Sequence, residues 1–424
     1  MANYLEMNRE ELTAEKAKLN EQYKKFLAMN LKLNMARGKP GKAQLDLVSD
    51  IFSLMQKPED YVSDGIDVRN YGELSGLPAA KRLFAEILGC KPEQVFVGGN
   101  ASLQLMYDTI SKAYTHGLLH SERPWCKEPV VKFLCPAPGY DRHFKVTESF
   151  GFELITIPMT DEGPDMDAVE KAIQDPAVKG MWNVPKYSNP DGIIYSDETI
   201  RRIASMKPAA PDFLLMWDNA YCIHEFEGDY VEFPDILAEC AKYGNADMVF
   251  EFASTSKVTL PGAGISCFAC SEANMAYMEK LLTVQVISFD KVNQQRHVLY
   301  LKDKANTLEL MKKHAAIMGP KFRCVVEALD REIAPLEIAS WRRPKGGYFV
   351  SLNAMPGTAK RTLALCKEAG VTMTGAGATY PYGKDPQDSN IRIAPSLPPV
   401  EELEQAIAVL CVCLKLAALE KLGV

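Results

Sequence analysis

The feature that most constrains the fold is a regular alternation of strand-like and helix-like segments, which begins near residue 75. Short apolar runs such as "QVFVGG", "VVKFLCP" and "GMWNVP" are each followed by a segment with helical character. Strands that alternate with helices form mostly parallel sheets, and the helices cover both faces. We therefore expect an α/β fold in which a mostly parallel sheet is sandwiched by helices.

The two ends of the chain predict a second, smaller domain. Residues 8–30 have the spacing of one amphipathic helix, and beyond about residue 300 the pattern is long helix, one strand-like piece and a final helix. A chain of 424 residues is also too long for one simple core. We expect residues 51–317 to form the large domain, residues 318–424 to form a small α+β domain, and residues 1–50 to pack against the small one.

Charge and cysteine content exclude several classes of protein. The formal net charge is −7, which argues against a general nucleic-acid binder. No apolar run approaches the ~18 residues that a membrane helix needs, and the acidic N-terminus does not resemble a signal peptide. The 11 cysteines include one CxxC, Cys267 to Cys270, without a second pair or nearby histidines. We expect no metal site, and reduced thiols in a cytoplasmic protein.

Polar residues follow several predicted strands, where ligands bind in open α/β sheets. Asn100, Ala101 and Ser102 open a helix after a Gly-Gly turn, which would suit an anion or would simply be a cap by Asn100. Tyr140 follows "PAPG" and would either stack on a flat ring or join the core. Asn189 precedes a proline, so its amide would face a cleft or serve an ordinary turn.

A carboxylate and a lysine follow two further strands. Asp218 comes directly after "FLLMW", where a carboxylate needs a cationic or protonated partner unless it merely caps a helix. Lys257 lies in "STSKVTLPGAG", a sheltered turn that would lower the pKa of its amine and free it for attack on a carbonyl. The alternative is a lysine with a buried stem and a solvated head.

If these residues meet at one edge of the sheet, they would form a binding site for pyridoxal 5'-phosphate. Lys257 would be the Schiff-base lysine, and Asp218 would keep the ring nitrogen protonated. Asn189 and Tyr221 would hydrogen-bond the ring oxygen. The rest of the predicted cofactor-binding set is Asn100, Ala101, Ser102, Tyr140, Ser254 and Ser256.

Across nearly its whole length the chain resembles the fold-type-I pyridoxal-phosphate aminotransferases. The motifs that carry the resemblance include "VGGNASL", "PAPGY", "YSNPDG", "DNAY", "STSK" and "NIRIAPS". Three others, "LNMARGKPG", "STSKVTLPGAGIS" and "DKVNQQRH", resemble the subgroup Ic aspartate aminotransferases. The resemblance implies transamination of an amino acid, in the first place L-aspartate, with 2-oxoglutarate as acceptor.

The resemblance also implies further site residues. Tyr71 would reach the cofactor phosphate of the partner subunit, which implies a homodimer with active sites at the subunit interface. Arg392 would bind the substrate α-carboxylate, and the backbone of Gly38 would contact the same group. One departure is Gly264, which stands where many relatives carry a phosphate-binding arginine.

A dicarboxylic substrate needs a second cation. The candidates are Arg37, Lys39, Lys291 and Arg296. Arg37 lies in the irregular segment that should border the cleft, whereas Arg296 lies in "NQQRH", which the resemblance places near the partner's site. Each of the four could equally be a solvated surface charge.

Other functions stay open on the sequence alone. The same cofactor would serve an aminotransferase for aminoadipate, aromatic donors or alanine, and also a β-eliminating lyase. A non-enzymatic ligand sensor would need an attached DNA-binding module. The thirty residues before "LKLNMARG" are too few and too acidic to form one.

Overall fold

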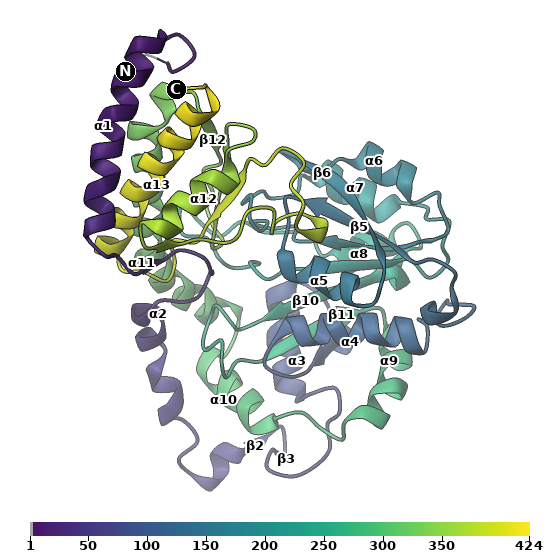
Figure 1. The fold of residues 1–424 in the computed structure, drawn as a ribbon. Coiled ribbons are helices and arrows are strands. Elements are labelled where there is room, and N and C mark those ends of the chain that lie inside the picture. The colour runs from purple at the N-terminus through teal and green to yellow at the C-terminus, as the bar shows by residue number, and fades with distance from the viewer. Residues whose placement is uncertain (1–2) are drawn as a thin grey trace.

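The computed structural model, which describes residues 3–424, confirms the expected α/β class (Figure 1). Its main sheet has eight strands in the order β4-β11-β10-β9-β8-β5-β6-β7. Strands β10, β9, β8, β5 and β6 are parallel, while β11 runs antiparallel to both β10 and β4. The strand bounds are β4 Val95–Val97, β5 Lys132–Ala137, β6 Glu153–Thr160, β7 Gly163–Pro164, β8 Val178–Asn183, β9 Leu214–Asp218, β10 Val249–Ser254 and β11 Ser266–Cys270.

Helices cover both faces of this sheet. They are α3 Pro78–Leu88, α4 Ser102–Thr115, α5 Asp141–Ser149, α6 Met166–Ala172, α7 Asp197–Ser205, α8 Ile236–Ala241, α9 Glu272–Gln285 and α10 Lys291–Leu301. Because side chains alternate along a strand, β11 sends Cys267 into one apolar cluster and Cys270 into the other. The two cysteines of the CxxC therefore lie on opposite faces of the sheet and cannot share a metal ion.

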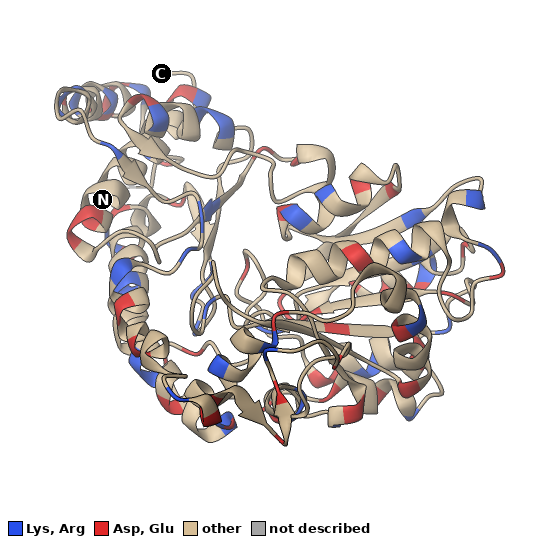
Figure 2. Ribbon diagram, turned by 90° about the horizontal axis from the view of Figure 1, so that it is seen from below, with Lys and Arg blue, Asp and Glu red and all other residues tan. Residues whose placement is uncertain are grey.

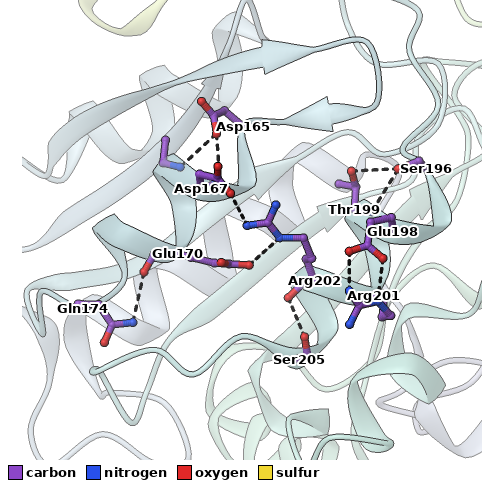
Figure 3. A network of polar contacts seen from close by, with 11 residues as sticks. Asp165, Asp167, Glu170, Gln174, Ser196, Glu198, Thr199, Arg201, Arg202 and Ser205 are labelled. Carbon is purple, nitrogen blue, oxygen red and sulfur yellow. Dashed lines mark hydrogen bonds and ion pairs between the residues drawn. The ribbon is translucent and has the colours of Figure 1, made fainter.

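Ion pairs join two of the covering helices at the surface. Arg202 of α7 donates from Nε to Glu170 at 2.8 Å and from Nη2 to Asp167 at 2.6 Å, both on α6 (Figure 3). The carboxylates raise the pKa of this guanidinium above its ordinary value. Exposed pairs of this kind add little stability, and none of these residues lines the cavity described below.

A second, three-stranded sheet forms the core of the other half of the molecule. It is antiparallel in the order β12-β13-β15, with bounds Ala339–Trp341, Val350–Ala354 and Asn390–Ile393. Helices α11 Lys304–Glu332, α12 Ala359–Glu368 and α13 Val400–Lys421 surround it. Helix α1, Arg9–Ala28, runs beside α13 (Figure 1) and shares its apolar cluster through Leu12, Leu19 and Tyr23. The division of the chain into domains stays a prediction.

Two small two-stranded sheets and a short helix complete the described strands and α-helices. Strand β1, Leu33–Asn34, pairs in parallel with β14, Val371–Thr372. The others are α2 Lys42–Leu47 and the hairpin of β2 Val62–Ser63 with β3 Ile66–Asp67. The β1–β14 pair brings the following residues, 36–39, to the mouth of the cavity between the sheets.

Charged residues of both signs are interspersed along the outer helices (Figure 2). No helix within residues 3–424 combines the length and the apolar character that crossing a bilayer would require. The strands of the main sheet instead bury their apolar side chains beneath the helices.

Candidate active site

A cavity of about 560 Å³ lies at the carboxyl ends of the central parallel strands, where the three-stranded sheet faces the main one. Most of the residues predicted from the sequence line it: Arg37, Gly38, Ala101, Ser102, Tyr140, Asn189, Asp218, Tyr221, Ser254, Ser256, Lys257 and Arg392. Four others do not line the cavity of their own chain. Asn100 and Tyr71 are exposed, and Lys291 and Arg296 lie on α10.

Lys257 lies in the turn that follows β10. Its Nζ is 5.0 Å from the centroid of the Tyr221 ring and 5.6 Å from that of Tyr348. Removal from water lowers the pKa of the amine, and the negative charge of Asp218 partly offsets this. The environment therefore favours the neutral, nucleophilic amine more than water does.

Asp218 ends β9, the parallel neighbour of β10, and pairs in register with Phe252. Its side chain is buried, and Oδ2 lies 2.9 Å from Nε2 of His143 on α5. The imidazole is stacked on Trp182 with 4.3 Å between ring centroids. Oδ1 has no hydrogen-bond partner within residues 3–424. A buried carboxylate oxygen without a hydrogen bond destabilises the folded protein, so Oδ1 is available to accept a hydrogen bond from a group bound in the cavity.

Two tyrosines stand beside this carboxylate. Burial, helped by the negative charge of the nearby Asp218, raises the pKa of Tyr140 to about 12. Burial also raises the pKa of Tyr221 well above its ordinary value, with additional effects from Tyr140 and Asp218. Both phenols therefore stay neutral at physiological pH and can donate a hydrogen bond.

One wall of the cavity suits an anion. Ala101 is the N-cap of α4, and no side chain hydrogen-bonds the first N–H groups of this 14-residue helix. Asn100 is thus not the cap. Ser102 begins the helix, and Ser254 Oγ donates to Ser256 Oγ at 3.0 Å across the same wall. The N–H of Gln104 donates to the carbonyl of Ala101 at 3.1 Å, but a helix N-terminus whose other first N–H groups are uncapped, with hydroxyls nearby, is a favourable place for a phosphate.

The turn around Gly264 leaves no space for a side chain, where the resemblance would place a phosphate-binding arginine. A Cβ at this position would lie 2.8 Å from Thr255 Oγ1 and 3.0 Å from the carbonyl oxygen of Leu260. Thr255 Oγ1 also accepts a hydrogen bond from the backbone N–H of Ile265 at 3.0 Å, so it cannot easily move. Glycine is therefore part of how this turn is built.

Arg392 enters the cavity from β15. Its Nη1 donates to Asp141 at 2.9 Å and to Asn189 Oδ1 at 3.2 Å, and its guanidinium lies 4.8 Å from the centre of the Phe349 ring. Gly38 packs on the same ring, because a Cβ there would be 2.6 Å from Phe349 Cζ. Phe349 thus fixes both groups that the resemblance assigns to the substrate carboxylate.

Further cations line the rim. The side chains of Arg37, Lys39 and Arg142 have no ion-pair or hydrogen-bond partner among the residues that the structure describes. Lys291, another candidate, instead donates from Nζ to the carbonyl of Gly72 at 2.8 Å, outside the cavity. Five cationic residues line the cavity: Arg37, Lys39, Arg142, Lys257 and Arg392. The lining has two acids, Asp141 and Asp218, and each already has a partner.

Sequence reasoning missed four residues of this site: Asp141, Arg142, His143 and Phe349. A signal existed for the first three, because "YDRH" places them within one helical turn of Tyr140. Phe349 follows a Gly-Gly turn in an apolar run, where nothing separates it from an ordinary core residue.

The chain is similar to known proteins of one enzyme class. Residues 7–424 match the family model of the aspartate amino-transferases. The aspartate aminotransferase of Corynebacterium glutamicum is 45% identical over 402 residues, which is 95% of this chain and 93% of that protein. The chain belongs to the aspartate amino-transferase family, and it is an aminotransferase.

Two solved structures have a similar fold. A crystal structure of an aspartate transaminase from C. glutamicum superposes with a TM-score of 0.96 at 44% identity, covering 98% of each chain. The α-aminoadipate aminotransferase LysN of Thermus thermophilus, complexed with N-(5'-phosphopyridoxyl)-L-leucine, has a TM-score of 0.73 at 20% identity, covering 94% of this chain and 95% of the other. The second likeness is one of fold alone.

Proposed function

We propose that this aminotransferase transfers the amino group of L-aspartate to 2-oxoglutarate, with pyridoxal 5'-phosphate as cofactor. The observation that carries the proposal is the meeting of Lys257 and Asp218 in one cavity that also has an excess of unpaired cations. A reactive amine beside a buried carboxylate fits the cofactor, while the excess of positive charge fits dicarboxylic substrates. The names of similar proteins point to the same donor.

The residues present fit this cofactor. The unpartnered Oδ1 of Asp218 would accept a hydrogen bond from the ring nitrogen. The uncapped start of α4, with Ser102, Ser254 and Ser256, would hold the phosphate without the arginine for which Gly264 leaves no room. When bound, the cofactor supplies an aldehyde that combines with amines and a protonated ring that takes up electrons.

Lys257 would perform the proton transfers. Its amine, with a pKa lowered by burial, would hold the cofactor between turnovers and then take the proton from the substrate Cα. Asp218 would keep the proton on the ring nitrogen, and His143 would fix the orientation of that carboxylate at 2.9 Å. Tyr221 and Asn189 would donate hydrogen bonds to the ring oxygen, because both line the cavity and Tyr221 stays protonated.

Two positive regions would hold the two carboxylates of the substrate. Arg392 would bind the α-carboxylate, together with the backbone of Gly38, on the platform that Phe349 provides. Arg37, Lys39 and Arg142 are the cations available to the distal carboxylate on this chain, because each lines the cavity without an anionic partner of its own. Arg296 would act only on the partner's site.

The proposal includes a homodimer in the cytoplasm. Tyr71 is 78% exposed and does not line its own cavity, which suits a role in the neighbouring subunit's site. The cysteines in the described part of the chain are all unpaired and most are buried, which suits a reducing compartment.

A donor panel tests the proposal. The purified protein, loaded with pyridoxal phosphate, is assayed with 2-oxoglutarate and either aspartate, aminoadipate, alanine, tyrosine or kynurenine. We expect aspartate to give the highest kcat/KM, at least about tenfold above alanine and tyrosine, because only a dicarboxylate uses both cationic regions. A higher kcat/KM with alanine or tyrosine would refute the donor assignment. Release of ammonia and pyruvate from serine without an oxo acid would indicate a lyase.

A further inference from the structure

The arginine assigned to the substrate carboxylate already holds a carboxylate of this chain. Arg392 Nη1 lies 2.9 Å from Asp141 Oδ1, and the pair joins β15 of the small sheet to the first residue of α5 on the main sheet. Both residues line the cavity. The internal acid thus lies where an incoming carboxylate must bind if Arg392 has the role proposed above.

The donors of Arg392 that remain are not enough for a second carboxylate. Nε is buried and has no partner among residues 3–424. Nη2 has only a long contact, 3.4 Å, with Thr374 Oγ1. A bidentate carboxylate needs two adjacent donors that it can reach from the cavity. With Nε buried, these are Nη1 and Nη2, so the substrate must take Nη1 from its present partners.

Of the two partners on Nη1, Asp141 is the one that can leave. Its side chain is 30% exposed, and Arg392 is the only cation it contacts within 4 Å in the described chain. Once released it would remain in the first turn of α5, where the helix dipole favours a negative charge. Asn189, in contrast, is buried, and its amide oxygen is a neutral acceptor that does not repel a carboxylate.

We propose that Asp141 is a resident counterion of Arg392 that every substrate displaces when its α-carboxylate binds. Asp141 then sets the affinity of this site for carboxylates: it keeps the arginine paired in the absence of substrate, and it competes with substrate and product alike. The inference rests on the proposed role of Arg392, but it does not depend on which amino acid is the donor. It predicts that removing the charge of Asp141 strengthens carboxylate binding.

The test measures binding of two unreactive acids to the cofactor-loaded protein by titration calorimetry. Propionate has one carboxylate and succinate has the two carboxylates of aspartate, and neither has an amine. We expect Asp141→Asn to bind both acids roughly fivefold more tightly than the wild type, the size of effect that one partly exposed ion pair contributes. Asp141→Ala, which removes the side chain, should show the same gain.

The matched control is Asp161→Asn. Asp161 also pairs with an arginine of the other half of the molecule, Arg342 at 2.7 Å, but neither residue lines the cavity. This variant should bind both acids as the wild type does. Unchanged or weaker binding by Asp141→Asn and Asp141→Ala would overturn the inference, because Asp141 would then only hold Arg392 in place. If the gain is present but succinate binds no better than propionate, the inference stands and the dicarboxylate preference fails.

Discussion

At the scale of single residues, Arg392 is the side chain on which both substrates depend. The amino donor and the oxo acid each carry a carboxylate next to the reacting carbon, so one cation serves both half-reactions. Its guanidinium is buried, lies against Phe349 and donates to Asn189 Oδ1 at 3.2 Å, all of which fix its orientation. A rigid, desolvated cation of this kind discriminates strongly between the presence and the absence of a carboxylate.

Replacing Arg392 by alanine should lower kcat/KM for every amino donor by roughly 10²- to 10³-fold, because a buried charge partner is removed. Steady-state kinetics with aspartate, alanine and tyrosine measure the effect, and Arg392→Lys should lose less. A loss confined to dicarboxylic donors would show that Arg392 binds the distal carboxylate and that the two anion sites have been exchanged.

Residues at strand ends could be predicted from the sequence, but residues that other elements bring to them could not. Asp218 follows an apolar run directly and Lys257 follows one after three hydroxyl residues, so their place in the chain already indicates the sheet edge. His143 reaches Asp218 across 75 residues, and Asp141 reaches Arg392 across 251. The "YDRH" motif indicates that both residues lie near Tyr140, but their partners depend on how the rest of the chain packs around α5.

At the scale of elements, the parallel neighbours β9 and β10 deliver the acid and the lysine to the same edge. The alternation of strands and helices predicted this part of the sheet correctly. It did not predict β11, Ser266–Cys270, which inserts antiparallel between β10 and β4. A run of five residues after a glycine-rich turn is too short to show a period of hydrophobic residues that would distinguish a strand from a helix. Its buried position depends on pairing with β10 and β4.

Strand β10 also buries an acid whose titration should affect stability. Burial raises the pKa of Glu251 from 4.5 to about 8, although a hydrogen bond from Asn219 at 2.8 Å opposes the shift. Between these two pH values the unfolded chain has lost a proton that the folded chain keeps. The free energy of unfolding should therefore fall by up to about 1.4 kcal/mol per pH unit in that window, and not further above it.

Glu251→Gln keeps the amide acceptor for Asn219 but cannot ionise. Relative to the wild type, its free energy of unfolding should rise by about 2 kcal/mol between pH 6 and pH 8, as measured by urea denaturation. The exposed control Glu309→Gln should keep the same difference from the wild type at both pH values. An equal difference at both pH values for Glu251→Gln would mean that the buried carboxyl does not titrate in this range.

At the scale of the whole molecule, the cavity is lined by residues from the carboxyl ends of the main parallel strands and by Arg392 of the three-stranded sheet. The sequence pattern predicts two domains, and that division stays a prediction, but it gave no sign that Arg392 of β15 would lie beside Asp141 of α5. A further level of organisation is the proposed homodimer, in which Tyr71 completes the partner's site. Its exposed ring has no role in its own cavity.

Mixing two inactive variants tests this sharing of sites. Tyr71→Ala and Lys257→Ala should each have low activity as homodimers. After the subunits are exchanged by mild denaturation and refolding, hybrid dimers should contain one intact site, because Lys257 comes from one subunit and Tyr71 from the other. Random pairing predicts up to about a quarter of wild-type activity. Activity no greater than the mean of the two parents would place Tyr71 outside the shared site.

The most direct measurement concerns the lysine itself. The protein is loaded with pyridoxal phosphate, treated with sodium borohydride to make a lysine–aldehyde bond permanent, digested, and mapped by mass spectrometry. We predict one phosphopyridoxyl adduct per chain, on Lys257, and none on that peptide in the Lys257→Ala variant. An adduct on a different lysine, or no adduct in a folded wild-type protein, would contradict the assignment of this cavity as the catalytic site.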